Sequence, residues 1–133
     1  MKFTLTDRVL ERDAKKVTTL RLVTAGEEYL GDHFPGFPVL PGVMMLQALV
    51  EAARELAAEN GARDADRLVL GSVKAVKYGS FVRPGRLLRV EVTPGKGELE
   101  YKGTGTVSDP TGQEPDATAV SGRFTLRAVR TQD

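Results

Sequence analysis

One segment constrains the fold of this chain more than any other, because it has the composition of a long helix. Residues Pro41 to Glu59 read PGVMMLQALVEAARELAAE, with no glycine or proline after Gly42. Proline suits the first helical turn, and Asn60-Gly61 supplies a C-terminal stop. These nineteen residues, at about 1.5 Å each, predict a helix of about 28 Å.

The polar side chains of this segment fall on one stripe. They are Gln47, Glu51, Arg54 and Glu55. The spacing i, i+4, i+7 and i+8 places them on one side of a helix. We therefore expect the first half of the helix to be buried on most of its other sides.

The rest of the chain carries strand patterns separated by turn residues. The expected strands are residues 5–11, 17–23, 68–78, 87–93, 99–107 and 117–129. The turn signals between them include Asp13-Ala14-Lys15, Arg83-Pro84-Gly85, residues 93–97 and residues 108–112. Short connections favour hairpins and a mostly antiparallel sheet. One apolar helix among about six strands predicts an α+β fold in which a curved sheet wraps around the helix.

The composition excludes several classes of site. The length of 133 residues fits one domain, which we take to span residues 1–133. The absence of cysteine excludes disulfides and thiolate chemistry, and a single histidine excludes a site with two imidazoles from one chain. We expect no metal and no cofactor. No run approaches the ~18 apolar residues of a membrane helix, and MKFTLTDR has no signal-peptide core, so we expect a cytoplasmic protein.

Charge is unevenly distributed along the chain. The net charge of +1 argues against a nucleic-acid binder, yet residues 67–90 hold six basic residues and no acidic one. This stretch is either a solvated face that balances the acidic residues 51–66, or a docking surface for an acidic partner or a phosphate. The docking candidates are Lys77, Arg83 and Arg86.

The only histidine lies in a rigid loop before the helix. Residues 31–43 contain three prolines and three glycines, and His33 is among them. A lone histidine is more often structural than catalytic. This loop, however, leads into a helix N-terminus, whose free N–H groups can stabilise a developing negative charge. An imidazole beside such donors suits abstraction of a proton next to a thioester carbonyl, which favours a functional His33.

The loop resembles a known family signature. Residues 33–43, HFPGFPVLPGV, resemble the motif of the β-hydroxyacyl-acyl-carrier-protein dehydratases, the FabZ/FabA group of the hotdog fold. Asp7-Arg8-Val9, and Lys77-Tyr78 followed by Pro84-Gly85, resemble further segments of that family. The resemblance covers nearly the whole chain. It implies fatty acid biosynthesis, a homodimer or hexamer, and an acyl carrier protein with a phosphopantetheine-linked acyl chain as partner.

The resemblance also implies roles for particular residues. His33 would remove the α-proton, while a helix carboxylate from the other subunit would donate a proton to the departing β-hydroxyl. The backbone N–H of Gly42 would hydrogen-bond the thioester carbonyl. Phe34 and Val43 would bind the substrate beside it.

One departure from the family pattern concerns the acid. The family carboxylate falls fourteen residues after the histidine, where this chain has Gln47. An amide cannot shuttle a proton near neutral pH. Glu51 stands where the commonest pattern has glutamine, about 6 Å further along the helix. Either Glu51 replaces the acid, or it only belongs to the polar stripe.

Three functions remain open. The chain is a dehydratase, or a hotdog thioesterase in which Gln47 or Glu51 positions a water, or a non-catalytic acyl-binding subunit that pairs with a catalytic relative. The products formed from a β-hydroxyacyl thioester separate the three: an enoyl product, a free acid, or binding without turnover.

Overall fold

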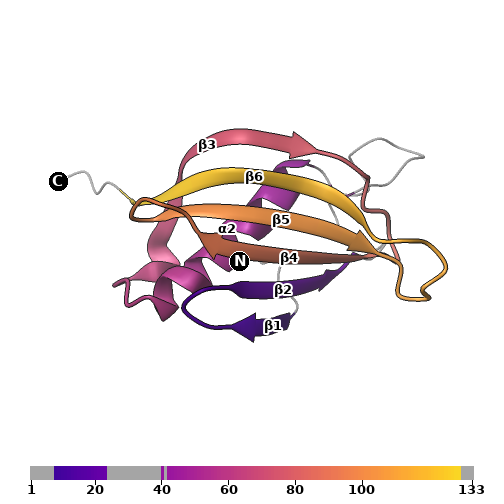
Figure 1. Ribbon diagram of the computed structural model, residues 1–133, viewed down its shortest axis with the longest axis horizontal. Coiled ribbons are helices and arrows are strands. Elements are labelled where there is room, and N and C mark those ends of the chain that lie inside the picture. Colours follow the sequence, from indigo (N-terminus) through magenta and orange to yellow (C-terminus); the bar gives the residue numbers. More distant parts are fainter. Residues whose placement is uncertain (1–7, 24–39, 41, 130–133) are drawn as a thin grey trace.

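The computed structural model describes residues 8–23, 40 and 42–129. In chain order its elements are β1 (Arg8–Arg12), β2 (Val17–Leu22), α2 (Gly42–Glu59), the 3-10 helix η1 (Ala65–Arg67), β3 (Leu68–Tyr78), β4 (Leu87–Pro94), β5 (Glu100–Ser108) and β6 (Ala117–Ala128). All strand pairs are antiparallel, in the order β1-β2-β4-β5-β6-β3. The curved sheet lies against α2 (Figure 1), which confirms the predicted architecture.

Helix α2 ends where the sequence predicts. The Asn60 N–H donates to the Leu56 carbonyl, and the Ala62 N–H donates to the Ala57 carbonyl at 2.9 Å. Gly61 lies between them at φ +85°, a left-handed conformation that favours glycine after a helix. The helix therefore ends at Glu59 because Gly61 reverses the chain, as the Asn60-Gly61 signal indicates.

The buried side of α2 is built from small and branched residues. Its buried residues are Met45, Ala48, Leu49, Val50, Ala52, Ala53, Leu56 and Ala57. Opposite Leu49 of the helix, strand β5 carries a glycine, because a Cβ at Gly103 would lie only 3.1 Å from Leu49 Cδ2. Alanines on the helix and glycine on the strand together bring α2 close to the centre of the sheet.

Two members of the polar stripe attach α2 to other elements. The Arg54 Nε donates to the Leu68 carbonyl at 2.7 Å, where η1 meets β3. The Glu55 carboxylate pairs with Arg12 of the edge strand β1 at 2.5 Å, and Glu59 lies 3.7 Å from the same guanidinium. The stripe is therefore used for tertiary contacts as well as for solvation.

The predicted turns are present at three hairpin or loop positions. The Asp13 carboxylate accepts hydrogen bonds from the Lys15 and Lys16 N–H groups, at 2.7 and 2.9 Å. In the turn after residue 82, Arg86 N–H donates to the Arg83 carbonyl, and Gly85 adopts φ +89°. Gly112 at φ +75° closes the turn that begins at Asp109. In each case a carboxylate or a glycine at a left-handed position fixes the reversal.

Strand β3 is less regular than its sequence suggests. Its pairing with β6 shifts register between Leu70 and Val73, and again between Lys74 and Lys77. Ala75 lies in the second shift at φ +52°, a conformation that costs a non-glycine residue free energy. Alternation of apolar residues predicts the strand but carries no information on these bulges.

Candidate functional site

The start of α2 is packed against the end of β3. A Cβ at Gly42 would lie 3.0 Å from Cε1 and 3.2 Å from Cζ of Tyr78. Glycine at position 42 therefore lets the tyrosine ring cover the first helical turn. The Leu40 N–H donates to the Val82 carbonyl at 2.8 Å, which fixes the chain just before the helix.

The electrostatics of this helix start suit an incoming negative charge. The first N–H groups of any helix have no partner within the helix, and the macrodipole makes that end positive. The first turn of α2 contains no acidic residue to neutralise it. Gly42, which the sequence predicts as the carbonyl-binding residue, lies at this end of the helix.

Apolar side chains are exposed around the helix start. Val43, Tyr78 and Phe81 have relative exposures of 67%, 51% and 59%. The segment after Tyr78 is held by β6, because the Gly79 and Ser80 N–H groups donate to the Ala119 and Thr118 carbonyls. Exposed apolar groups on a fixed framework are typical of a ligand or partner surface.

The structure orders the predicted helix residues along α2. Gln47 follows Val43 by four residues and is half-buried, and Glu51 follows Gln47 by one further turn and is also half-buried. Gly42, Val43 and Gln47 therefore share the first two turns. Glu51 lies deeper along the helix, in keeping with the axial displacement expected from its spacing. His33 and Phe34 lie outside the described residues.

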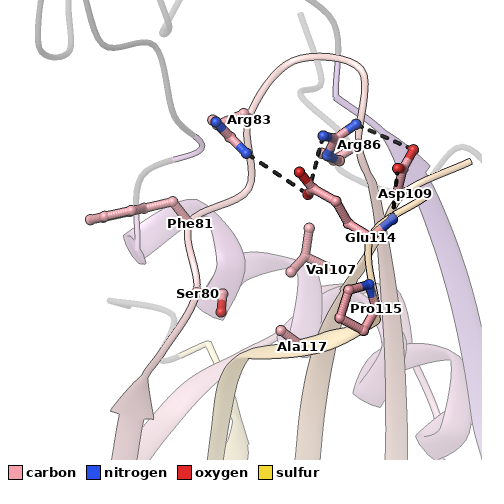
Figure 2. A pocket seen from close by; sticks show the side chains of 9 residues that line it. All are labelled: Ser80, Phe81, Arg83, Arg86, Val107, Asp109, Glu114, Pro115 and Ala117. Carbon is pink, nitrogen blue, oxygen red and sulfur yellow. Dashed lines mark hydrogen bonds and ion pairs between the residues drawn. The ribbon is translucent and has the colours of Figure 1, made fainter. Parts of the chain in front are cut away.

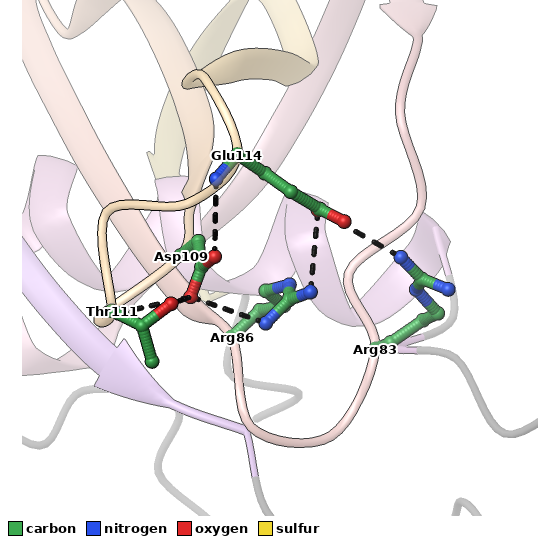
Figure 3. A network of polar contacts seen from close by, with 5 residues as sticks. All are labelled: Arg83, Arg86, Asp109, Thr111 and Glu114. Carbon is green, nitrogen blue, oxygen red and sulfur yellow. Dashed lines mark hydrogen bonds and ion pairs between the residues drawn. The ribbon is translucent and has the colours of Figure 1, made fainter.

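The predicted docking residues divide into two kinds. Lys77 lies exposed on the edge strand β3. Arg83 and Arg86 instead belong to a polar network with Asp109 and Glu114, in which Arg86 pairs with both carboxylates (Figure 3). Their ionic partners belong to the loop between β5 and β6, not to the acidic residues 51–66 that the first reading of the charge pattern proposed.

Asp109 anchors this network. Its Oδ1 accepts hydrogen bonds from the Thr111 N–H and hydroxyl at 2.9 and 2.8 Å and from Arg86 Nη1 at 3.3 Å. Its Oδ2 accepts one from the Glu114 N–H at 3.2 Å. The Thr111 donors, followed by Glu114 and the Arg86 charge, favour the ionised form and lower the pKa of Asp109.

A cavity of about 340 Å³ opens beside the network (Figure 2). It is lined by Ser80, Phe81, Arg83, Arg86, Val107, Asp109, Glu114, Pro115 and Ala117. The sequence reasoning did not find it, because its residues come from three separate segments. The Asp109-Pro110-Thr111-Gly112 turn signal locates the anchor but does not identify its partner.

The described residues lack two further features. In residues 8–23, 40 and 42–129, no three histidine, aspartate or glutamate side chains gather closely enough to hold a metal ion. Over the same part of the chain, no helix is both long and apolar enough to span a bilayer.

The curved antiparallel sheet on one long helix defines the hotdog fold. Residues 9–111 match the family described as ApeI-like, ApeI dehydratase. The chain belongs to this ApeI-like dehydratase family.

Relatives of known name support this classification. The chain is 40% identical over 91 residues to a 3-hydroxyacyl-[acyl-carrier-protein] dehydratase FabZ of Rhizorhabdus wittichii, covering 66% of this chain and 58% of the relative. It is 36% identical over 113 residues to a FabZ of Cupriavidus taiwanensis, covering 80% and 76%. The fold matches that of the dehydratase heterocomplex ApeI:P from Xenorhabdus doucetiae, with a TM-score of 0.69, 19% identity, and 95% and 98% coverage.

Proposed function

We propose that this chain dehydrates β-hydroxyacyl thioesters that are carried on the phosphopantetheine arm of an acyl carrier protein. The supporting observation is the family match over residues 9–111, which includes the histidine loop and the glycine-initiated helix. In the reaction a proton leaves the α-carbon and the hydroxyl leaves the β-carbon. The products are an enoyl thioester and one water.

The proposed roles follow from charge development. His33 takes the α-proton, and negative charge then grows on the thioester oxygen. The N–H of Gly42, at the positive end of α2, donates a hydrogen bond to that oxygen. The contact between Gly42 and Tyr78 supports this role, because the absence of a side chain at position 42 lets an apolar ring lie directly against the first turn of the helix.

The departing hydroxyl requires a proton, and the family position for the donor holds Gln47. In this proposal the Gln47 amide holds the hydroxyl by hydrogen bonds. Glu51 is the nearest helical carboxylate along the same face, one turn further from Gly42. A catalytic constellation tolerates displacements of about 0.5 Å, so direct transfer from Glu51 requires the substrate to sit deeper, and bound water is the other donor.

The proposal includes a homodimer, or a hexamer built from such dimers, that acts in the cytoplasm. Strand β3 has eleven residues and lies at one edge of the sheet, where among the described strands it pairs only with β6. Its residues 71–75 are exposed in the single chain. An open edge of this length, next to the apolar residues Tyr78 and Phe81, favours pairing with a second copy.

A product assay tests the function. The purified chain is incubated with a β-hydroxyacyl thioester on acyl carrier protein, and the products are separated by mass. We expect an enoyl product that His33→Ala abolishes. A free acid as the main product would contradict dehydration and show that the protein is a thioesterase.

The second candidate is an acyl-binding subunit without turnover of its own. The observation that favours it is Gln47 at the position of the expected acid. A fold relative is itself named as a dehydratase heterocomplex, ApeI:P. Substrate binding without product, together with activity on adding a catalytic relative, would support this candidate.

A further inference from the structure

The cavity beside the 83–86 turn has two unlike walls. The charged wall consists of Arg83, Arg86, Asp109 and Glu114, and the apolar wall consists of Val107, Pro115 and Ala117. Figure 2 shows the two arginines and Glu114 converging above the apolar side chains. The volume of about 340 Å³ is that of a small-molecule site. A ligand that fits both walls carries an anion next to a short aliphatic group.

The two carboxylates of the charged wall are held differently. The Asp109 side chain is 3% exposed and receives the Thr111, Arg86 and Glu114 hydrogen bonds described above. The Glu114 side chain is 55% exposed, and its Oε2 lies 3.2 Å from Arg86 Nη2 and 3.9 Å from Arg83 Nη2. Exposed ion pairs of this kind contribute little to stability. Asp109 is therefore a fixed part of the site, and Glu114 can move away at small cost.

Moving Glu114 would change the charge of the cavity. With Glu114 in place, two guanidinium groups face two carboxylates (Figure 3). Without it, Asp109 still orients Arg86 through Nη1, while Arg86 Nη2 and Arg83 lose their shared partner. Two guanidinium groups with one net positive charge then face the cavity, an arrangement that suits the oxygens of a phosphate ester.

The cavity is connected to the proposed active site by a short segment. Tyr78 covers Gly42, and the Val82 carbonyl binds the Leu40 N–H, while Ser80 and Phe81 line the cavity itself. Arg83 follows Tyr78 by five positions, so their Cα atoms are at most about 18 Å apart. One extended thioester arm can therefore reach both places.

We propose that this cavity binds the phosphate of the pantetheine arm, and that Glu114 occupies the place of that phosphate in the unliganded protein. The identity of the ligand rests on the function proposed above. The binding site itself is the cavity, which is separate from the proposed catalytic residues at the start of α2. Arg83 and Arg86 hold the phosphate, and the branched carbon group next to the phosphate lies on Val107, Pro115 and Ala117. Glu114 acts as a displaceable counter-ion that lowers the affinity for the arm.

Calorimetric titration with phosphopantetheine and with unphosphorylated pantetheine tests the site without any turnover. We expect the native protein to bind phosphopantetheine at least about fivefold more tightly than pantetheine. Arg83→Gln should remove most of this difference. Glu114→Gln should tighten phosphopantetheine binding about two- to fivefold, as expected when an exposed ion pair no longer competes. Binding of pantetheine should not change in either variant.

The control is Arg63→Gln, which removes an exposed arginine beside a different cavity, one also lined by Arg67 and Val129. It should leave both affinities unchanged. Arg86→Gln is not used, because it would leave the buried Asp109 without its cationic partner and endanger folding. Circular dichroism confirms that each variant is folded before titration.

Two results would overturn the proposal: equal affinity for both probes, or a phosphate preference that survives Arg83→Gln. Coenzyme A and holo acyl carrier protein carry the same phosphate next to the same branched group. Binding of either one with the same dependence on Arg83 supports the site and identifies the source of the phosphate. If phosphopantetheine binds as expected but no enoyl product forms, the proposed function fails and this site stands.

Discussion

The side chain at position 47 decides what the first turns of α2 can do with a proton. Gln47 lies half-buried, four residues after the exposed Val43. Its amide can donate and accept hydrogen bonds but has no proton to release near neutral pH. The position therefore supports binding of a hydroxyl group and gives no general acid.

We predict that Gln47→Glu raises the rate of dehydration. One positioned general acid contributes about 10²–10⁴-fold, and the glutamate restores a carboxyl group of nearly the same size at the family position. Turnover of a β-hydroxyacyl thioester, measured by enoyl absorbance, should rise by at least about tenfold. Glu51→Gln is the matched comparison, and it should reduce the native rate only if Glu51 is the donor. A native rate equal to that of Gln47→Glu, with Glu51→Gln neutral, would assign the proton to another group.

A second residue-scale prediction concerns Asp109. Hydrogen bonds from Thr111 lower its pKa below the ordinary value of 3.8, so the folded state favours the ionised form. This contribution to stability is fully present above that ordinary value and is lost as pH falls through the lower, folded pKa. Asp109→Asn should therefore lower the Tm at pH 7, and its difference from the native protein should shrink below about pH 4. A constant difference across the acid range would contradict this account.

The site residues that belong to a local sequence motif can be predicted from the sequence. Gly42 and Gln47 are found because the loop, the helix start and the helix period are contiguous in the chain. The contact of Tyr78 with Gly42, and that of Glu114 with Arg86, join residues more than 25 positions apart. Such contacts depend on strand order and register, which no local pattern specifies.

At the scale of elements, strand β3 combines length with irregularity. Its two register shifts against β6 have the form of β-bulges, which increase the local twist of a strand. The composition of residues 68–78 predicts the strand correctly, with the bounds that are observed. The bulges escape prediction because Ala75, unlike glycine, gives no signal for a left-handed backbone.

We predict that Ala75→Gly stabilises the protein. Ala75 at φ +52° carries a left-handed cost of about 1–2 kcal/mol, which glycine avoids, while the extra entropy of unfolded glycine offsets about 0.5–1 kcal/mol. The free energy of unfolding in urea should rise by up to about 1 kcal/mol. The control Ala119→Gly, at a buried position of β6, should lower it. A loss of stability in Ala75→Gly would mean that the alanine methyl group makes a packing contact worth more than the strain.

For the whole molecule, the open edge at β3 predicts a dimer. Residues 71–75 are exposed along this edge, and Tyr78 at the end of the same strand contacts the start of α2. Light scattering at micromolar concentration should give twice the mass of the chain, or a higher even multiple. A charge placed on the edge by Val73→Asp should shift the mass toward the monomer, whereas Leu10→Asp on β1, equally exposed at the opposite edge, should not. A monomeric native mass would remove the argument for a shared site.

Surface charge yields a further prediction at this scale. Lys77 is exposed on β3, and its charge is available to an acidic carrier protein. Lys77→Glu should raise the KM for a carrier-bound substrate several-fold and leave the KM for a small pantetheine thioester unchanged. Lys102→Glu, at an exposed position of the central strand β5, is the matched reversal and should affect neither. Equal loss on both substrates in Lys77→Glu would indicate damage to the fold.

The architecture as a whole could be predicted further than the site. One apolar helix and the spacing of turn residues predict a curved antiparallel sheet around a helix, and the strand bounds agree within one or two residues wherever the structure describes them. Burial alternates along β4, where Leu88, Val90 and Val92 are buried, so the alternating apolar residues of its sequence predict the strand. The order of the strands cannot be predicted in this way, because β3 pairs with β6 and not with β4, the next strand along the chain.

The position of β3 beside β6 has a consequence for folding during translation. A ribosome delivers α2 and β3 before β6, yet β3 finds its hydrogen-bonding partner only when residues 117–128 have been translated. Until then the Gly79 and Ser80 N–H groups lack the β6 carbonyls that they bind, and Tyr78 lacks its strand partner Val120. The start of α2 is thus completed by one of the most distant parts of the described sequence. A nonsense codon or frameshift at the beginning of β6 would abolish the site while leaving every residue proposed to act in it intact.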